Sequence, residues 1–593
     1  MGSVLERVPS WARGRSGHRL LGGLVVVVLV VVLAVSCSGG ASGTVDVPVQ
    51  SGKPDAGVTG VRAPSTTTGG TLRVVSGPVD SLDPQRSYSP GVWNLMRLYV
   101  RTLVTYSSKP GKTGQLVPDL ATDLGTTPDG GSTWTFTLKD GVAFAGGRPI
   151  TSKDVKYGIE RSFASDVVVG GPNYVVDLLD DPGNQYAGPY QDEAPDHLGL
   201  GSIETPDDKT LVFHLRTPQP DFPFVMALPS SSPVPVESDT GANYGTAPVS
   251  SGPYTITAVD ATSIRLERNK DWKQATDDVR TALPDAVVVR TGLSGIERDQ
   301  AVLAGSADVD ITGAGVQPAT TARLTQDDTD PPLSDRVDDV TTGAVRLLAL
   351  PTDVAPFDNA DCRAAVAQAV DRRSLQQAQG GAGAAVRSSV LWPRGLPGGP
   401  QDTDPAPDPA AARKSLEACG QAHGFSTVLA VADAPTSVGV AREVAHELSG
   451  IGIKVDVQAL DPTTFYATDV GDPDNVKAKG YGIILATWTG DFPTPASFLV
   501  PLVDGRSIRT PGNTNYARLN DADINGLVDT ARAAAGGNGA LDAWGEVSTA
   551  AAKSAAYVPL SENRIQLIAG QRLRNGLVMQ PYGGYDLATA GVR

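Results

Sequence analysis

The segment that decides the fold is 133–155, TWTFTLKDGVAFAGGRPITSKDV. Polar and apolar residues alternate over 133–138, as expected for a strand with one buried face. The Asp-Gly at 140–141 and the Gly-Gly-Arg-Pro at 146–149 are typical turn sequences. Thr151 to Asp154 has the pattern of a capping box, which predicts the start of a helix. A strand, turns and a helix therefore follow one another within this short stretch.

Short strands and helices alternate along the rest of the chain as well. β-Branched and apolar runs predict strands, and apolar residues at helical spacing predict helices. The expected strands include 71–75, 211–215, 263–268, 453–457 and 483–486, and the expected helices include 92–104 and 437–448. This alternation indicates an α/β architecture rather than a sandwich or a helical bundle.

The N-terminal region has the pattern of an export signal. Several arginines precede an uninterrupted apolar run, 20–35, and Cys37 follows among small residues. The arrangement resembles a bacterial lipobox, in which the cysteine becomes the lipid-bearing N-terminus, although Ala34 stands where Leu is usual. We therefore expect 1–37 to be a lipoprotein signal peptide and Cys37 to be lipidated, with an uncleaved anchor or simple secretion as alternatives. Each alternative places the remaining chain outside the cytoplasm.

Residues 38–68 are rich in Gly, Ser, Thr, Val and Pro and lack sustained apolar periodicity. Such a composition buries too little apolar surface to offset the entropy of the chain. We expect a flexible tether, with an irregular strand region as the alternative.

The remaining two cysteines, Cys362 and Cys419, each lie in a segment with helical character. Outside the cytoplasm thiols tend to oxidise, and two cysteines are the minimum for a bridge. The sequence leaves two possibilities open: a disulfide between them, or two buried free thiols.

Composition and motifs argue against several functions. A net charge of −16 without a basic patch makes nucleic acid an unfavourable partner. The chain lacks a G-x-S-x-G nucleophile elbow and a C-x-x-C pair, and Gly450 stands where the second His of a zinc-protease motif would be. Its five histidines are scattered along the chain. We therefore expect no enzyme activity, no cofactor and no metal site.

A series of ordered motifs resembles the extracellular solute-binding proteins of peptide-type ABC importers, the dipeptide- and oligopeptide-binding family 5. The resemblance spans about 70–590, and the motifs within 129–155 are the most specific. The motifs of this series are Gly69–Arg73, Ser81–Pro84, Leu116–Ala121, Asp129–Gly130, Trp134–Phe136, Leu138–Val142, Gly147–Val155, Ser251–Tyr254, Leu266–Asn269, Ala304–Asp310, Pro356–Asn359, Ala369–Arg372 and Trp488–Pro495. The resemblance implies a two-lobed α/β fold of the periplasmic-binding-protein type, class II, with an extra inserted subdomain and the ligand between the lobes.

The resemblance also implies which residues bind the ligand. Asp491 would receive the α-ammonium group of a peptide, and Trp488, Thr489 and Gly490 would present backbone to it. Tyr88, Ser89 and Pro90 would face the ligand from the other lobe. Arg387 and Arg394 are candidates for the partner of the peptide carboxylate. Thr494 departs from the family pattern, which often has a second acid there, so the exact ligand stays open.

The same resemblance divides the mature chain into lobes. Lobe I would comprise 69–113, 200–300 and 558–593, the inserted subdomain 114–199, and lobe II 301–557. The expected function is capture of dipeptides or oligopeptides in a closing cleft, for delivery to a membrane permease and its ATPase subunits, by a lipid-anchored monomer on the outer face of the cell membrane. The alternatives are another solute, such as an oligosaccharide or a metal complex, and a tethered sensor without transport.

Overall fold

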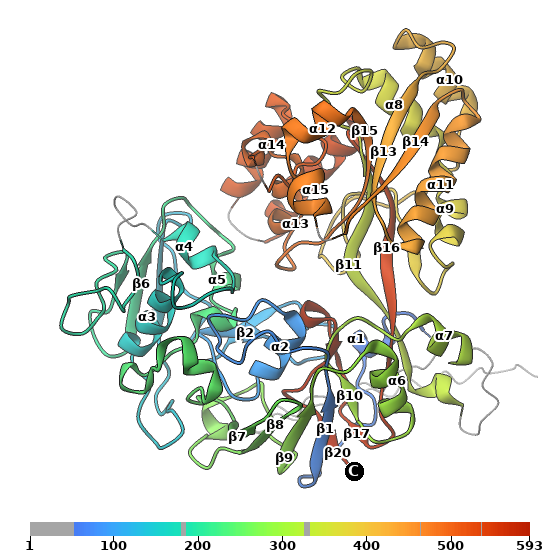
Figure 1. Cartoon of the computed structure of the whole chain (residues 1–593). Helices are drawn as coiled ribbons and strands as arrows, with labels where there is room; N and C mark the ends of the chain where they lie inside the picture. The colour runs from blue at the N-terminus through green and yellow to red at the C-terminus, as the bar shows by residue number, and fades with distance from the viewer. Residues whose placement is uncertain (1–52, 180–185, 325–331, 463, 511, 535–536) are drawn as a thin grey trace, which may run out of the picture. The chain divides into compact units, whose positions relative to one another are not determined.

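The computed structural model describes residues 53–179, 186–324, 332–462, 464–510, 512–534 and 537–593, and the predicted signal peptide with Cys37 lies outside these ranges. We call lobe I the part of the chain built on a five-stranded sheet, with strand order β10-β1-β9-β8-β7 (Figure 1). Its strands are β1 (Thr71–Val75), β7 (Tyr254–Val259), β8 (Ser263–Arg268), β9 (Ala286–Arg290) and β10 (Val309–Asp310). Strand β1 runs parallel to both of its neighbours, β10 and β9.

Lobe II is built on a six-stranded mixed sheet with strand order β12-β16-β11-β15-β13-β14. The strands are β11 (Val337–Ala349), β12 (Ala385–Arg387), β13 (Ser426–Ala432), β14 (Lys454–Leu460), β15 (Tyr481–Trp488) and β16 (Tyr557–Ile568). The accompanying helices are α8 (Ala360–Ala369), α9 (Arg372–Ala378), α10 (Pro409–Ala418), α11 (Pro435–Ser449), α12 (Pro473–Lys479), α13 (Pro495–Val503), α14 (Ala522–Ala533) and α15 (Gly537–Lys553). Two separate hydrophobic clusters contain residues of this sheet. Val345 belongs to one cluster and Leu348 to the other.

The inserted subdomain contains the segment 133–155 with its strand, turns and helix. Residues 133–137 form β4, which pairs antiparallel with β6 (Thr210–His214), and β6 pairs with β5 (Ile203–Glu204). Thr151 donates its N–H and its hydroxyl to the Asp154 carboxylate at 2.8 Å, so the expected capping box is present at the start of α3 (Ser152–Glu160). The short helices α4 (Tyr174–Leu178) and α5 (Phe222–Val225) complete the part that faces lobe II.

Remaining elements of the described chain are short. They are α1 (Ala56–Thr59), α2 (Pro90–Met96), α6 (Gly295–Leu303), α7 (Pro318–Leu324), β2 (Val104–Tyr106), β3 (Leu116–Pro118), β17 (Leu573–Arg574), β18 (Val578–Met579), β19 (Gly584–Tyr585) and β20 (Gly591–Val592).

The helix expected over 92–104 ends early, because α2 stops at Met96. The carbonyls of Leu98 and Tyr99 accept N–H groups from the 251–254 segment, and a Cβ on Gly252 would lie only 2.7 Å from the Leu98 carbonyl oxygen. These long-range bonds replace the helical ones.

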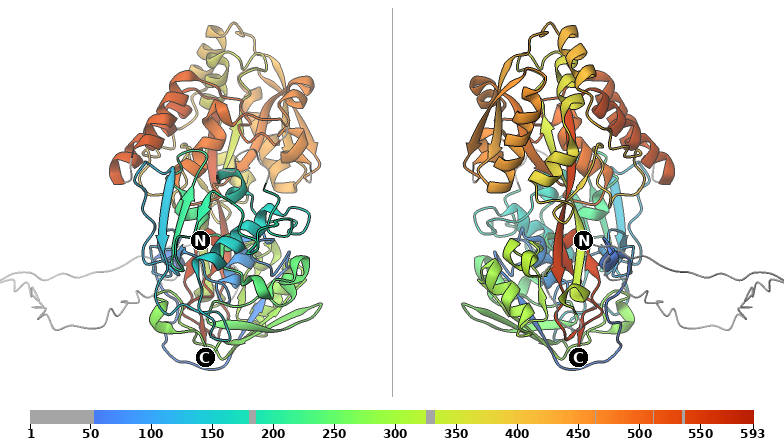
Figure 2. Two further views of the ribbon diagram at one scale, coloured as in Figure 1. Left: turned by 90° about the vertical axis from the view of Figure 1, so that its left-hand side faces the viewer. Right: turned by 90° about the vertical axis from the view of Figure 1, so that its right-hand side faces the viewer.

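Two long antiparallel strands, β11 and β16, carry the chain between the lobes and run side by side in Figures 1 and 2. Val340 of β11 and Leu567 of β16 belong to the hydrophobic core of lobe I, whereas Val345 belongs to that of lobe II. The pairing register shifts between Thr341 and Val345, and Gly343 within this bulge has a φ of 75°. Because a bulge bends its strand, the crossing pair has its bend between the two cores.

The strand pairing moves three of the expected domain boundaries. Strand β10 belongs to the lobe I sheet although it follows residue 300, and β5 and β6 belong to the subdomain sheet although they follow residue 199. Strand β16 pairs with lobe II strands although most of it follows residue 557. Each difference arises because strands pair with partners that are distant in sequence, which local composition does not reveal.

The last part of the expected tether, 53–68, is folded. Arg62 forms an ion pair at 2.8 Å with the buried carboxylate of Asp338 on β11, and the Tyr585 hydroxyl also donates to Asp338. The Asp55 carboxylate accepts the N–H of Thr341 at 2.8 Å, next to the bulge. This correction has a physical reason: charged side chains and main-chain bonds hold the segment, and neither produces apolar periodicity. Residues 38–52 lie outside the described chain.

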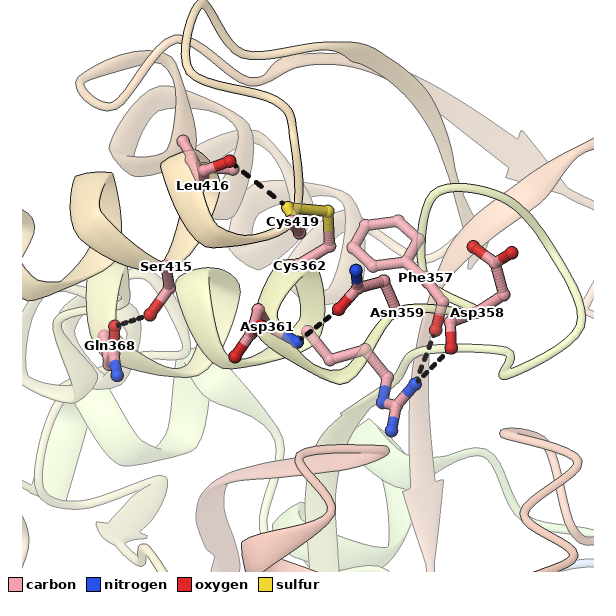
Figure 3. Close-up of a disulfide and its surroundings, with 10 residues drawn as sticks. Phe357, Asp358, Asn359, Asp361, Cys362, Gln368, Ser415, Leu416 and Cys419 are labelled. Carbon is pink, nitrogen blue, oxygen red and sulfur yellow. Dashed lines mark hydrogen bonds between the residues drawn. A yellow bond between two sulfur atoms is a disulfide. The ribbon is translucent and has the colours of Figure 1, made fainter.

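Figure 3 shows how Cys362 and Cys419 are joined in a disulfide, with a Cα–Cα distance of 5.5 Å. Cys362 lies in α8 and is buried, and Cys419 directly follows α10. The Ser415 hydroxyl of α10 donates to the Gln368 side chain of α8 at 3.0 Å, so the two helices are linked at a second point. Of the two possibilities that the sequence left open, the structure contains the bridge.

Glu447 on α11 makes the stability of lobe II dependent on pH. One of its oxygens accepts the N–H of Asp371, the other is buried without a hydrogen-bond partner, and burial raises the pKa of Glu447 from 4.5 to about 8. The folded state therefore binds a proton more tightly than the unfolded state, so the free energy of unfolding falls as the pH rises from about 4.5 to 8.

We expect Glu447→Gln to increase the free energy of unfolding by about 2 kcal/mol at pH 9 and to leave it unchanged at pH 4, because Gln keeps the acceptor for Asp371 and removes the charge. Urea unfolding at the two pH values measures this difference. Glu417→Gln, at an exposed position on α10, is the matched control and should have no effect at either pH. An equal gain for Glu447→Gln at both pH values would contradict the assignment.

Candidate functional site

A cavity of about 1160 Å³ lies between the inserted subdomain and lobe II. Its subdomain side includes Trp134, Tyr174 and Phe224, and its lobe II side includes the loop that follows β15 and the start of α13. In α/β proteins, ligands gather beyond the carboxyl ends of parallel strands, and β15 runs parallel to β13. The position therefore agrees with the general rule for ligand sites in this class of fold.

The β15–α13 loop, 489–494, is held in place by bonds at both ends. The Trp488 indole N–H donates to the Phe498 carbonyl at 2.8 Å, and the N–H of Phe492 donates to the Ser497 hydroxyl at 3.0 Å. Thr494 caps α13, because its hydroxyl oxygen accepts the N–H of Ser497 at 3.2 Å. The loop thus carries Asp491 between anchored neighbours.

The same loop contacts the subdomain directly. The Phe492 ring lies 5.0 Å from the Tyr174 ring and 6.1 Å from the Phe224 ring, centroid to centroid. The Thr494 hydroxyl donates to the Asp221 carboxylate with an oxygen–oxygen distance of 2.6 Å. One aromatic cluster and one short hydrogen bond therefore join the two walls of the cavity.

Asp491 lines the cavity and is exposed to it, and it forms no ion pair with any described residue. Tyr174 of the opposite wall and Tyr88 of lobe I lie near it. Burial and then the negative charge of Asp491 raise the pKa of Tyr174 and of Tyr88, so both hydroxyls stay protonated at neutral pH. The site therefore offers a carboxylate beside two neutral hydroxyl groups.

The structure brings some of the sequence-predicted site residues together and separates others. Thr489 and Gly490 line a smaller pocket of about 120 Å³ that shares Asp491 with the main cavity. Trp488 lines neither pocket and packs against the lobe II core. Tyr88 is 53% exposed and near Asp491. Ser89 occupies the N-cap position of α2 without a side-chain capping bond, and Pro90 begins the helix. None of these three residues is among those that line the two pockets.

Of the two candidate partners for a carboxylate, only Arg394 lines the cavity. Its guanidinium is paired with Asp402 at 3.3 Å, and Arg387 is paired with Asp404 at 2.7 Å. Arg532 also lines the cavity and lies 3.6 Å from Asp504. Lys112, in the turn between β2 and β3, is exposed at the cavity and forms no ion pair with a described residue.

Three residues that line the cavity, Lys112, Tyr174 and Asp221, were not predicted from the sequence. Lys112, Tyr174 and Asp221 belong to none of the motifs that carry the resemblance. The one available signal was the Pro-Asp-Phe-Pro turn at 220–223, which places an acid before a short helix.

Within the part of the chain that the structure describes, no group of three or more His, Cys, Asp or Glu side chains is arranged to hold a metal ion. None of the described helices combines the length and the apolar character that crossing a bilayer requires.

Comparison with known proteins identifies the family. The family model described as bacterial extracellular solute-binding proteins, family 5 Middle, matches residues 115–509. Heme-binding protein A of Haemophilus influenzae is 26% identical over 251 residues, which are 41% of this chain and 43% of that protein. The oligopeptide-binding protein OppA of Bacillus subtilis is 26% identical over 279 residues, 44% of this chain and 46% of that protein. The chain thus spans about half the length of these curated relatives.

Among solved structures, clavulanic acid biosynthesis oligopeptide binding protein 2 is 38% identical, with a TM-score of 0.85, over 91% of this chain and 99% of that chain. The expected two-lobed α/β fold is confirmed by this likeness. The family model alone matches more than half of the chain. The chain therefore belongs to family 5 of the bacterial extracellular solute-binding proteins.

Proposed function

We propose that the protein captures short peptides between its lobes and delivers them to the permease and ATPase subunits of an ABC importer. The observation that carries this proposal is Asp491, an acid that lines the cavity and has no cationic partner among the described residues. A peptide ammonium group supplies the missing positive charge, and a charge-assisted hydrogen bond contributes about 1.5–3 kcal/mol. Two relatives, OppA and the clavulanic acid protein, are named oligopeptide-binding proteins.

The carboxylate end of a peptide would be bound by a basic residue of the same cavity. Lys112 is exposed there without an ion pair among the described residues, whereas Arg394 and Arg532 already lie near Asp402 and Asp504. We therefore assign the peptide carboxylate to Lys112, which replaces the two arginines expected from the sequence. Tyr88 and the backbone of Thr489 and Gly490 would complete the contacts along the peptide.

The two crossing strands, β11 and β16, would allow the lobes to close over a ligand. A ligand held between the lobes makes contacts with both of them only when they are close together, so it shifts the population toward the closed form. Lipidation of Cys37 would keep the protein at the outer face of the membrane and raise its effective concentration at the permease. On this proposal the protein acts as a monomer and catalyses no reaction, and ATP hydrolysis belongs to its partners.

The test is to identify the ligand. We expect native mass spectrometry of the mature protein, purified without denaturation, to show one bound peptide of a few residues per chain. Isothermal titration of the stripped protein with unmodified tripeptides should then show 1:1 binding. A bound heme or saccharide in place of a peptide, together with no binding of any tripeptide, would contradict the proposal.

A further inference from the structure

Asp221 is directed into the cavity rather than toward its own helix. It precedes α5, where an aspartate normally accepts the N–H groups of the first helical turn, but its side chain accepts none of them. One carboxylate oxygen accepts the Thr494 hydroxyl at 2.6 Å, and the other accepts no hydrogen bond from a described residue. Since Thr494 also caps α13, the bond that orients Asp221 is itself fixed by lobe II.

No Lys or Arg among the described residues forms an ion pair with Asp221, which is half-buried in the cavity wall. Burial raises the pKa of the Asp221 carboxyl, and the hydrogen bond from Thr494 lowers that pKa by less than burial raises it. A half-buried carboxylate without a cation is unfavourable, because it loses water and gains no opposite charge. A positively charged group placed beside Asp221 would therefore be bound favourably.

The surroundings of Asp221 suit a long basic side chain. Trp134, Leu178 and Phe224 line the subdomain side of the same cavity and are largely apolar. Lys and Arg pack their methylene stems on such surfaces while the charged end reaches a polar partner. Aromatic faces add attraction for a guanidinium group.

We propose that Asp221 binds a second cationic group of the cargo, so that the preferred ligands are peptides with a Lys or Arg side chain. This inference rests on the proposed peptide-binding function. The charges of the cavity agree with it: Asp491 and Asp221 are two acids without cations, and Lys112 is one base without an acid. A peptide with an α-ammonium group, one basic side chain and one carboxylate matches this set.

The experiment uses three tripeptides with arginine at the first, second or third position and alanine elsewhere, each paired with the peptide in which citrulline replaces arginine. Citrulline has nearly the same shape and no charge. Isothermal titration of the stripped protein should show, for at least one position, binding of the arginine peptide about 10- to 100-fold tighter than that of its citrulline partner.

Asp221→Asn should reduce this ratio to about one while leaving the affinity for the citrulline peptide within about threefold, since Asn can still accept the Thr494 hydroxyl. Asp278→Asn removes the same charge at an exposed position of lobe I that does not line the cavity, and it should keep the full ratio. Equal binding of arginine and citrulline peptides by the unmodified protein, or a ratio that persists in Asp221→Asn, would overturn the inference and leave the proposed function standing. Failure of all six peptides to bind would overturn both.

Discussion

Replacing Asp491 by alanine is expected to weaken the binding of an unmodified peptide about 10- to 100-fold. The carboxylate is the partner that we assign to the α-ammonium group, and the loss of a charge-assisted hydrogen bond costs about 1.5–3 kcal/mol. Tyr88 and Tyr174 stay neutral beside it, so they cannot replace its charge. Isothermal titration of both proteins with the same peptide measures the change.

Binding of the acetylated form of that peptide distinguishes the loss of the ammonium contact from a general effect of the substitution on the loop. N-Acetylation removes the ammonium charge, so unmodified protein and Asp491→Ala should bind the acetylated peptide with similar, weak affinity. Asp433→Ala, at an exposed position of lobe II outside the cavity, should bind both peptides as the unmodified protein does. Equal losses for the free and acetylated peptides would remove the ammonium assignment.

Removing the disulfide by the double substitution Cys362→Ser and Cys419→Ser is expected to lower the free energy of unfolding of lobe II by about 4 kcal/mol. The bridge closes a loop whose ends are 57 residues apart, and cross-linking a loop of this length restricts the unfolded chain strongly. The fold itself should persist, because α8 and α10 also pack through buried residues such as Ala365 and Leu416. Urea unfolding followed by circular dichroism gives the difference.

Reduction provides the matched comparison. Dithiothreitol should bring the unmodified protein to the stability of the double variant and should have no effect on the variant itself. Peptide affinity should be unchanged in both, because neither cysteine lines the cavity. A double variant as stable as the oxidised protein would show that the bridge contributes nothing to folding.

Local patterns were sufficient where neighbouring residues decide the conformation. The strand at 263–268 and the capping box at Thr151 are as predicted, because alternation and capping act over a few positions. The helix expected over 92–104 failed because the 251–254 segment takes up its carbonyls. The folded segment around Arg62 was not predicted either, because its partner Asp338 is distant in the sequence.

For the site, the sequence alone determined that a loop with Asp491 follows a buried strand, because a hydrophobic run and the residues after it can be read locally. Which groups face that loop depends on the three-dimensional packing of distant segments. This packing placed Tyr174 and Asp221 of the subdomain against Phe492 and Thr494, and it left Lys112 exposed at the cavity without an ion pair among the described residues. The physical reason is that the two walls come from chain segments hundreds of residues apart, and their contacts depend on how the sheets and the crossing strands pair.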